Sequence, residues 1–225
     1  MAVELAERCG PEATVIAVDP WKSGLDRLRQ KVNRLGLSNI VVLEADASAL
    51  DLDSASVDLI VSNLGVNNFD EPAAVLASCY RVARDGATLC VTTNPIGHMA
   101  EFYDVYRATL AELGQNDRLP VLERHINHRG TPESLARLLA GAGFVVDQTT
   151  ARGFTMKFAN GSALLRHHFI RLAFVQGWVA IADPTAVDAT FARLEGELNA
   201  VARSRGGLTM TIPMTCVVAH KRKSV

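Results

Sequence analysis

Two acidic residues stand where neighbouring strands are expected to end. Asp19 closes the apolar run TVIAVD, and Asp46 follows the run IVVLEA. Because the carboxyl ends of parallel strands meet at one edge of a sheet, where ligands bind in α/β folds, we expect the two side chains to be neighbours. A carboxylate accepts two hydrogen bonds, which suits a ribose diol at Asp19, and a second carboxylate at Asp46 can accept from an exocyclic amine such as that of adenine. The spacing predicts a nucleoside-binding edge.

The elements that would position these acids are short apolar runs alternating with amphipathic stretches. The expected strands are 14–18, 40–43, 57–62, 87–92, 144–150 and 208–218. The expected helices are 2–9, 22–35, 72–82, 98–113 and one that begins with Thr131 as its N-cap and Pro132 at its first position. This alternation predicts an α/β fold with a doubly wound, mostly parallel, Rossmann-like sheet and right-handed crossovers.

Residues 162–203 are wholly helical in pattern, in two pieces broken at Asp183 and Pro184. No internal repeat or low-complexity linker interrupts the chain. We therefore expect a single domain, 1–225, with a helical insertion at 162–203 ahead of the last strand.

The composition favours a globular chain with a large core. Of 225 residues, 48% are hydrophobic and 21% charged, and the formal net charge is −1, so the broad positive field of a nucleic-acid binder is missing. No apolar run approaches the ~18 residues of a membrane span, and the start does not resemble a signal peptide. The four cysteines form no Cys-x-x-Cys pair, which favours a reduced, cytoplasmic setting. His125 and His128 are three apart without a third ligand, so no metal site is expected.

The order of elements and the two acids resemble the class I S-adenosylmethionine-dependent methyltransferases, over roughly residues 2–150. The stretch 56–95, SVDLIVSNLGVNNFDEPAAVLASCYRVARDGATLCVTTNP, is similar to that family's fourth strand, following helix and fifth strand, with RVARDG as the helix ending. Small-molecule members, such as quinone-biosynthesis methyltransferases, are similar. The resemblance implies S-adenosyl-L-methionine as cofactor, a small-molecule acceptor and an antiparallel last strand.

The resemblance also implies roles for seven residues. Asp19 would bind the ribose hydroxyls, Pro20 and Trp21 would flank the adenine, Asp46 and Ala47 would meet its polar edge, and Asn63 and Leu64 would line the methionine part. Taken singly, Asp19 is equally well explained as an acid that complements the dipole at a helix N-terminus. Trp21 is equally well explained as a packing residue. The ordered set favours cofactor binding.

One part of the family's pattern is missing. Its first strand and glycine-rich loop would lie immediately before the helix that begins here at Met1, whereas the chain's only Gly-x-Gly, Gly141–Gly143, ends a later helix. That loop lets the backbone approach the methionine part of the cofactor without a Cβ in the way. The chain is then either an incomplete copy or a degenerate relative, and we favour the first.

Because the family's first strand is central, we expect strands 14–18 and 57–62 to be paired directly or separated by a gap. Their exposed edges predict marginal stability or aggregation.

The acceptor side is expected after Asn94 and in the helical insertion, which would roof the pocket. The candidate catalytic residues are His98, His167 and His168, and the candidate substrate residues are Asn67, Asn68, Tyr103, His128 and Arg129. Methyl transfer is an in-line displacement that needs a base, such as a histidine, only when the acceptor must lose a proton.

Two other functions stay open: a nucleotide-cofactor dehydrogenase, which would need the missing Gly-x-Gly-x-x-Gly, and a non-catalytic scaffold that binds a partner protein. The oligomeric state is open.

Overall fold

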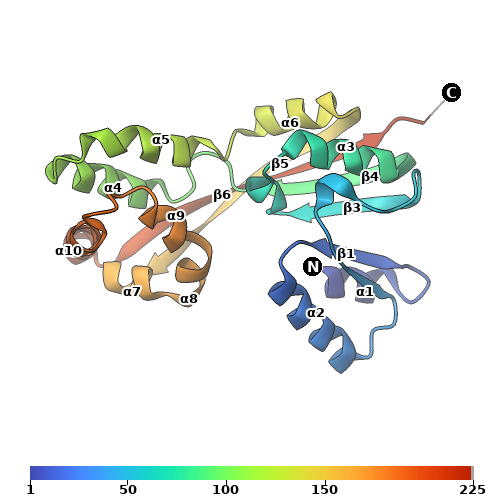
Figure 1. Ribbon diagram of the computed structural model, residues 1–225, viewed down its shortest axis with the longest axis horizontal. Coiled ribbons are helices and arrows are strands. Elements are labelled where there is room, and N and C mark those ends of the chain that lie inside the picture. Colours follow the sequence, from blue (N-terminus) through green and yellow to red (C-terminus); the bar gives the residue numbers. More distant parts are fainter. Residues whose placement is uncertain (224–225) are drawn as a thin grey trace. The chain divides into compact units, whose positions relative to one another are not determined.

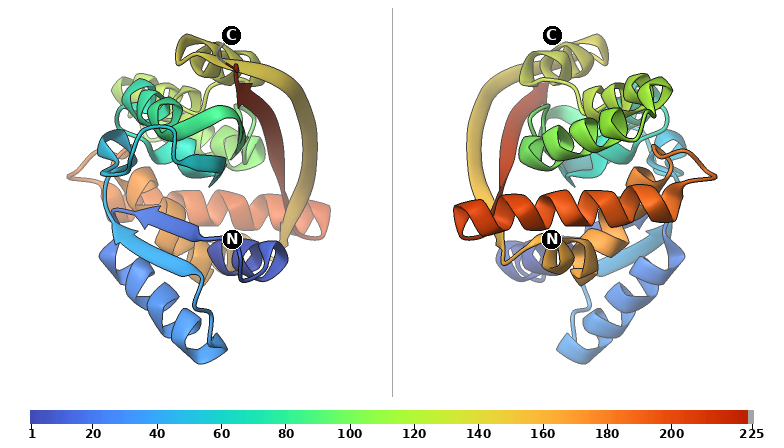
Figure 2. Two further views of the ribbon diagram at one scale, coloured as in Figure 1. Left: turned by 90° about the vertical axis from the view of Figure 1, so that its right-hand side faces the viewer. Right: turned by 90° about the vertical axis from the view of Figure 1, so that its left-hand side faces the viewer.

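The computed structural model describes residues 1–223 (Figures 1 and 2). Their contacts divide the chain into two compact units. Unit 1 comprises Met1–Thr92, Leu135–Gln148 and the residues from Val217 on. Unit 2 comprises Thr93–Ser134 and Thr149–Cys216. The single domain expected from the sequence stays a prediction.

Unit 1 begins with a small two-stranded sheet. Its elements are α1 (Ala2–Cys9), β1 (Val15–Asp19), α2 (Lys22–Leu35) and β2 (Ile40–Glu44), drawn in blue in Figure 1. β1 and β2 are parallel, in a register that runs from Val15 opposite Ile40 to Asp19 opposite Glu44. The Asn39 amide donates hydrogen bonds to backbone carbonyls of α1 and the loop after it, at 2.9–3.2 Å, which fastens the helix to the start of β2. The predicted helix 22–35 is confirmed as α2, and Leu25 and Val32 are its buried residues.

The larger sheet has the order β3-β4-β6-β5. Its strands are β3 (Val57–Asn63), β4 (Ala83–Thr93), β5 (Phe144–Phe158) and β6 (Leu208–Lys221); β3 and β4 are parallel, and the last strand is antiparallel. The helices α3 (Pro72–Val82) and α6 (Pro132–Gly141) run along one side of this sheet (Figure 1). Side chains of both helices, including Val75, Leu76 and Leu139, share a core with Leu89 and Val217 of the strands. The predicted mixed α/β fold is confirmed.

Strands β1 and β3 lie in different sheets. Within residues 1–223, β1 pairs only with β2, and β3 is hydrogen-bonded only to β4. Of the two arrangements expected for a missing central strand, direct pairing is therefore excluded. The end of β2 is instead held through the short helix η1 (Ala47–Ala49), which packs against α3. The Leu50 N–H donates to Ser78 Oγ at 3.3 Å, and the Arg81 guanidinium donates to the Leu52 carbonyl at 2.7 Å.

Unit 2 is built around an aromatic core. Its helical elements are α4 (Ala100–Glu112), η3 (Asn116–Arg118), α5 (Leu119–Asn127), α7 (Gly161–Arg166), α8 (His168–Ile170), the π-helical turn η4 (Arg171–Val175), α9 (Gln176–Val179) and α10 (Val187–Arg205). Phe102, Tyr106 and Trp178 are fully buried together with Leu198 and with Met210 of β6. The predicted break at Asp183–Pro184 falls between α9 and α10 and is confirmed.

The helical segment 162–203 supplies a large part of this core. Leu164, Ile170, Trp178, Leu194 and Leu198 all belong to it. Deleting the segment would therefore dismantle unit 2, and point substitutions are the sharper test of its role. None of the helices that the structure describes is long and apolar enough to cross a membrane.

The contact between α7 and α10 depends on a glycine. A Cβ placed on Gly161 would lie 2.5 Å from Leu198 Cβ and 3.1 Å from the Glu195 carbonyl oxygen. We expect Gly161→Ala to lower the free energy of unfolding by about 1–3 kcal/mol, because neither neighbour is a flexible chain end. Gly196 on α10 has open space around its Cα. Gly196→Ala should therefore raise stability by roughly 0.5–1 kcal/mol through helix propensity. Urea unfolding of both variants checks this pair, and destabilisation of equal size would contradict it.

Candidate functional site

Asp19 lies at the carboxyl end of β1 and shapes the turn that follows. Its Oδ1 accepts the Trp21 N–H at 2.8 Å, while Oδ2 makes no hydrogen bond to any described residue. The Trp21 side chain is 53% exposed, and its ring lies over the first turn of α2, where a Cβ on Gly24 would be 2.7 Å from Trp21 Cε3. Gly24 therefore makes room for the ring. The strand ends in an exposed acid with a spare acceptor oxygen beside an exposed aromatic face, and Pro20 is exposed between them.

Asp46 lies at the same edge. Since Asp19 is opposite Glu44 in the register, Asp46 comes two residues beyond the paired end of β2. Its Oδ1 accepts the Ser48 N–H at 2.7 Å and caps η1. These hydrogen bonds from Ser48 lower the pKa of the Asp46 carboxyl, which keeps it ionised. Ala47 packs partly buried against the core under α3. The sequence-based expectation that the two acids are neighbours agrees with this pairing.

The end of β3 also forms a tight polar turn. Thr92 Oγ1 donates to Asn63 Oδ1 at 2.6 Å, and the Leu64 N–H donates to the Thr92 carbonyl at 3.0 Å. Leu64 has φ 62°, in the left-handed region, a conformation that costs of order 1–3 kcal/mol in a non-glycine residue and that clusters at functional sites. Asn67 and Asn68 follow in the short helix η2 (Gly65–Asn68). All the residues assigned to the cofactor from the sequence therefore lie at strand ends or in the turns directly after them.

The candidate acceptor residues Tyr103 and Arg129 belong to unit 2, in a group that we call the His98 cluster: His98, Tyr103, His125, Arg129, Phe174 and Trp178. Trp178 Nε1 donates to Tyr103 Oη at 3.2 Å, and Tyr103 Oη lies 3.2 Å from His125 Nε2. A phenolic oxygen can accept two hydrogen bonds and donate one, so Tyr103 Oη links the indole N–H of Trp178 to the imidazole of His125.

The two histidines of this cluster, buried His98 and half-buried His125, are held neutral. His98 is 4% exposed, and its ring stacks on Phe174 with the ring centroids 5.5 Å apart. Burial, and then the charge of Arg129, lower the pKa of His98 to about 3. Burial, and then His128 and Arg129, lower the pKa of His125 to about 4. Side chains with such low pKa values are weak bases, which disfavours His98 as the proton acceptor suggested by the sequence.

The other candidate histidines are solvent-exposed. His167 and His168 lie at the junction of α7 and α8, with the His167 ring edge-on to Phe158 at a centroid distance of 5.6 Å. His128 is exposed as well, and its Nδ1 lies 2.7 Å from the His125 carbonyl oxygen. Sequence reasoning did not select His125, Phe174 or Trp178 as functional, because their meeting with Tyr103 depends on tertiary contacts.

The neutral histidines predict acid sensitivity. An unfolded histidine has a pKa near 6.5, so on acidification the unfolded chain binds protons that folded His98 and His125 do not bind. Stability should therefore fall as the pH drops from about 6.5 towards about 4. His125 is partly exposed, so its contribution is reduced by solvent screening. We expect the free energy of unfolding to fall by about 2 kcal/mol between pH 7.5 and pH 5. Urea unfolding at both pH values measures it, and the variant His98→Leu/His125→Leu should lose most of this dependence. An unchanged pH dependence in that variant would contradict the assignment.

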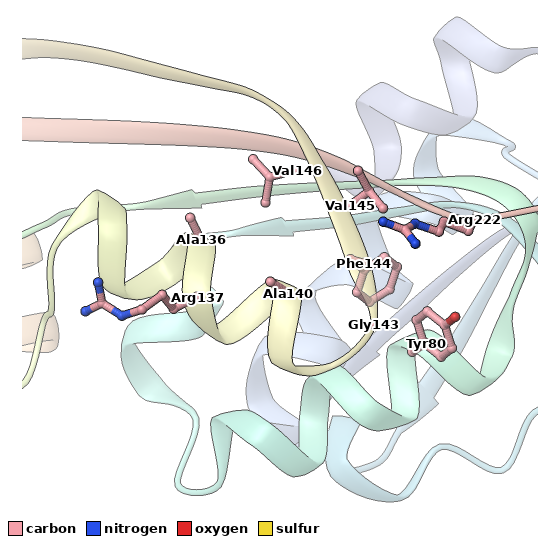
Figure 3. Close-up of a pocket in the computed structure, with 9 residues that line it drawn as sticks. All are labelled: Tyr80, Ala136, Arg137, Ala140, Gly143, Phe144, Val145, Val146 and Arg222. Atoms are coloured by element: carbon pink, nitrogen blue, oxygen red, sulfur yellow. The ribbon is translucent and has the colours of Figure 1, made fainter.

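A shallow pocket of about 760 Å³ lies elsewhere in unit 1 (Figure 3). Tyr80, Arg137, Phe144 and Arg222 are among the side chains that line it. It contains none of the residues predicted from the sequence, and its lining has no carboxylate, histidine or thiol. Its size alone does not make it a reaction site.

Acids and a strained turn lie at the carboxyl ends of parallel strands, the edge at which α/β proteins bind nucleotide cofactors. Residues 1–91 match the family described as "Methyltransferase domain". A demethylmenaquinone methyltransferase of Thermus thermophilus is 30% identical over 155 residues, which are 65% of this chain and 70% of that protein. One from Geobacillus kaustophilus is 27% identical over 153 residues, 64% of this chain and 65% of that protein, so this chain spans just under two thirds of that relative. The structure of a SAM-dependent methyltransferase from Methanosarcina mazei superposes with a TM-score of 0.57 at 14% identity, covering 100% of this chain and 88% of the other.

The chain belongs to the class I S-adenosylmethionine-dependent methyltransferases.

Proposed function

We propose that this protein transfers a methyl group from S-adenosyl-L-methionine to a small-molecule acceptor. The observation that carries the proposal is the β1–β2 register, which brings Asp19 and Asp46 to one edge of a parallel pair. Membership of the methyltransferase family supports the same cofactor.

The side chains at this edge fit the cofactor's chemistry. Asp19 keeps one carboxylate oxygen for a ribose diol, and the Trp21 ring lies exposed over Gly24, where it can flank an adenine with Pro20. Asp46 and Ala47 would meet the polar edge of the adenine. Asn63 and Leu64 would line the methionine part from the end of β3. When bound, S-adenosylmethionine supplies an electrophilic methyl group on a sulfonium.

The protein's own residues would then act by binding and orientation. Holding two reactants in line can account for a large share of the rate of a displacement reaction. Asn67 and Asn68 are acceptor candidates within unit 1, and Tyr103, His128 and Arg129 are acceptor candidates within unit 2. A base is needed only for an acceptor that must lose a proton, and His167 and His168 are the remaining histidine candidates.

Quinones are one class of acceptor to test, because the Thermus and Geobacillus relatives are named demethylmenaquinone methyltransferases. The two other functions kept open by the sequence are a nucleotide-cofactor dehydrogenase and a scaffold without catalysis. The dehydrogenase would need a Gly-x-Gly-x-x-Gly that this sequence does not contain.

Calorimetric titration of the full protein separates these functions. We expect S-adenosylhomocysteine to bind and NADH not to bind. Transfer of a tritiated methyl group from S-adenosylmethionine to a demethylated naphthoquinol and to aromatic acids would then identify the acceptor. Binding of NADH alone would favour the dehydrogenase, and binding of neither would favour the scaffold.

A further inference from the structure

We propose that the His98 cluster binds the anionic oxygen group, a carboxylate or a phenolate, of an aromatic acceptor. The inference deepens the proposed function and rests on it, since the molecule bound there would be the methyl acceptor. Three features of unit 2 carry it: a guanidinium without a carboxylate partner, a buried imidazole nitrogen without a hydrogen bond, and an aromatic wall beside both.

The first feature is the charge of Arg129. Arg84, Arg107 and Arg193 each form an ion pair with an acid, whereas no ion pair of the described residues includes Arg129. Its Nε is buried without a hydrogen-bond partner, and its Cζ lies 6.0 Å from the centroid of the Phe174 ring. The guanidinium also interacts with the neutral Tyr103 hydroxyl. A partly buried cation without an ion-pair partner is costly, and an anion would relieve that cost.

The second feature is His98. Its Nδ1 is buried and has no hydrogen-bond partner, although buried polar atoms are nearly always paired. The ring is neutral, so it offers one N–H donor and one acceptor nitrogen. His98 and Arg129 both lie against Phe174. Two unpaired buried polar atoms around one ring indicate a place for a polar ligand group.

The third feature is the apolar wall. Phe174 stacks on Trp178 with the ring centroids 5.7 Å apart. The Phe169 ring contacts Phe174 edge-on, also at a centroid distance of 5.7 Å. Phe174 belongs to the π-helical turn Arg171–Val175, and single π-helical turns occur frequently at functional sites. Phe169 and Leu172 are 49% and 60% exposed. Aromatic rings beside a cation favour an acceptor that is itself a planar aromatic anion.

An anionic acceptor also removes the need for a base. An oxygen lone pair of the carboxylate or phenolate forms the new O–CH₃ bond while the C–S bond of the sulfonium breaks. The bonding pair stays on sulfur, which becomes a neutral thioether, and no proton is released. This chemistry agrees with a cluster whose two histidines stay neutral and are weak bases.

Fluorescence titration tests the proposal. The chain has two tryptophans, so in the full protein carrying Trp21→Phe the emission reports on Trp178 alone. Two probes are 4-hydroxybenzoate and the neutral 4-hydroxybenzamide. A third, 1-naphthol, is titrated at one pH below and one pH above its own pKa, and it tests whether a phenolate binds. We expect 4-hydroxybenzoate to bind at least about tenfold more tightly than the amide, since a charge-assisted bidentate contact to arginine is lost in the amide.

Substitutions assign the effect to the cluster. Arg129→Gln should weaken 4-hydroxybenzoate binding about tenfold or more, Arg129→Lys should keep part of it, and His98→Gln should weaken it several-fold. Arg124→Gln, on exposed Arg124 of α5, is the matched control and should leave the affinity unchanged. Near-UV circular dichroism confirms that each variant is folded.

Equal affinity for the acid and the amide, or full affinity in a folded Arg129→Gln variant, would overturn the proposal. Calorimetry with S-adenosylhomocysteine on the unsubstituted protein runs in parallel. Cofactor binding without anion binding would overturn this inference alone, whereas anion binding without cofactor binding would overturn the proposed function and leave an anion site in unit 2.

Discussion

Replacing Trp178 by alanine is expected to lower the free energy of unfolding of unit 2 by about 3–5 kcal/mol. The side chain is fully buried and stacks on Phe102 with the ring centroids 3.9 Å apart. Its Nε1–H also donates to Tyr103 Oη, so truncation would leave a large cavity and remove a buried hydrogen bond. Few single substitutions in this chain should cost as much.

Urea unfolding followed by circular dichroism measures the loss, and amide hydrogen exchange places it in unit 2. Phe154→Ala provides the control, because Phe154 is also a large apolar side chain but is 53% exposed. It should change stability by no more than about 0.5 kcal/mol. A similar loss in both variants would mean that Trp178 does not organise the core.

Asp19→Ala is expected to weaken S-adenosylhomocysteine binding by about 10–100-fold, which corresponds to ~1–3 kcal/mol for hydrogen bonds to a charged group. The substitution removes the free carboxylate oxygen and also the acceptor of the Trp21 N–H. Asp19→Asn would keep an oxygen for that N–H while removing the charge, so it should lie between the natural protein and the alanine variant. Calorimetry gives the affinities.

Asp51→Ala is the control for this comparison, since Asp51 is an exposed acid in the loop after η1. The affinity of the Asp51→Ala variant for S-adenosylhomocysteine and its free energy of unfolding should match those of the natural protein. Stability should also hardly change in Asp19→Ala, because the side chain is exposed. Unaltered affinity in Asp19→Ala would remove this residue from the cofactor site and weaken the proposed function.

Much of unit 1 could be predicted from local pattern. The short apolar runs became β1, β2 and β3, and Thr131 caps α6 through a hydrogen bond from the Ser134 N–H to Thr131 Oγ1 at 3.2 Å. Sequence reasoning erred at two places. Asp85 and Gly86 were expected to close a helix before the strand, yet both lie within β4, because Val57 pairs with Ala83 and extends the ladder. No helix is predicted between residue 113 and Thr131, yet this stretch contains α5, whose Leu119, Leu122 and Ile126 are at helical spacing.

The sequence by itself determined the alternation of elements, the acids at two strand ends and the family resemblance, because these depend on side-chain period and on residues close together along the chain. Only the tertiary structure decided that β1 and β3 lie in different sheets, since strand pairing is non-local. The same holds for the His98 cluster, in which Tyr103 meets a histidine 22 residues away and a tryptophan 75 residues away. Burial and the neighbouring charge of Arg129 make His98 a weak base, and neither can be read from the residue type.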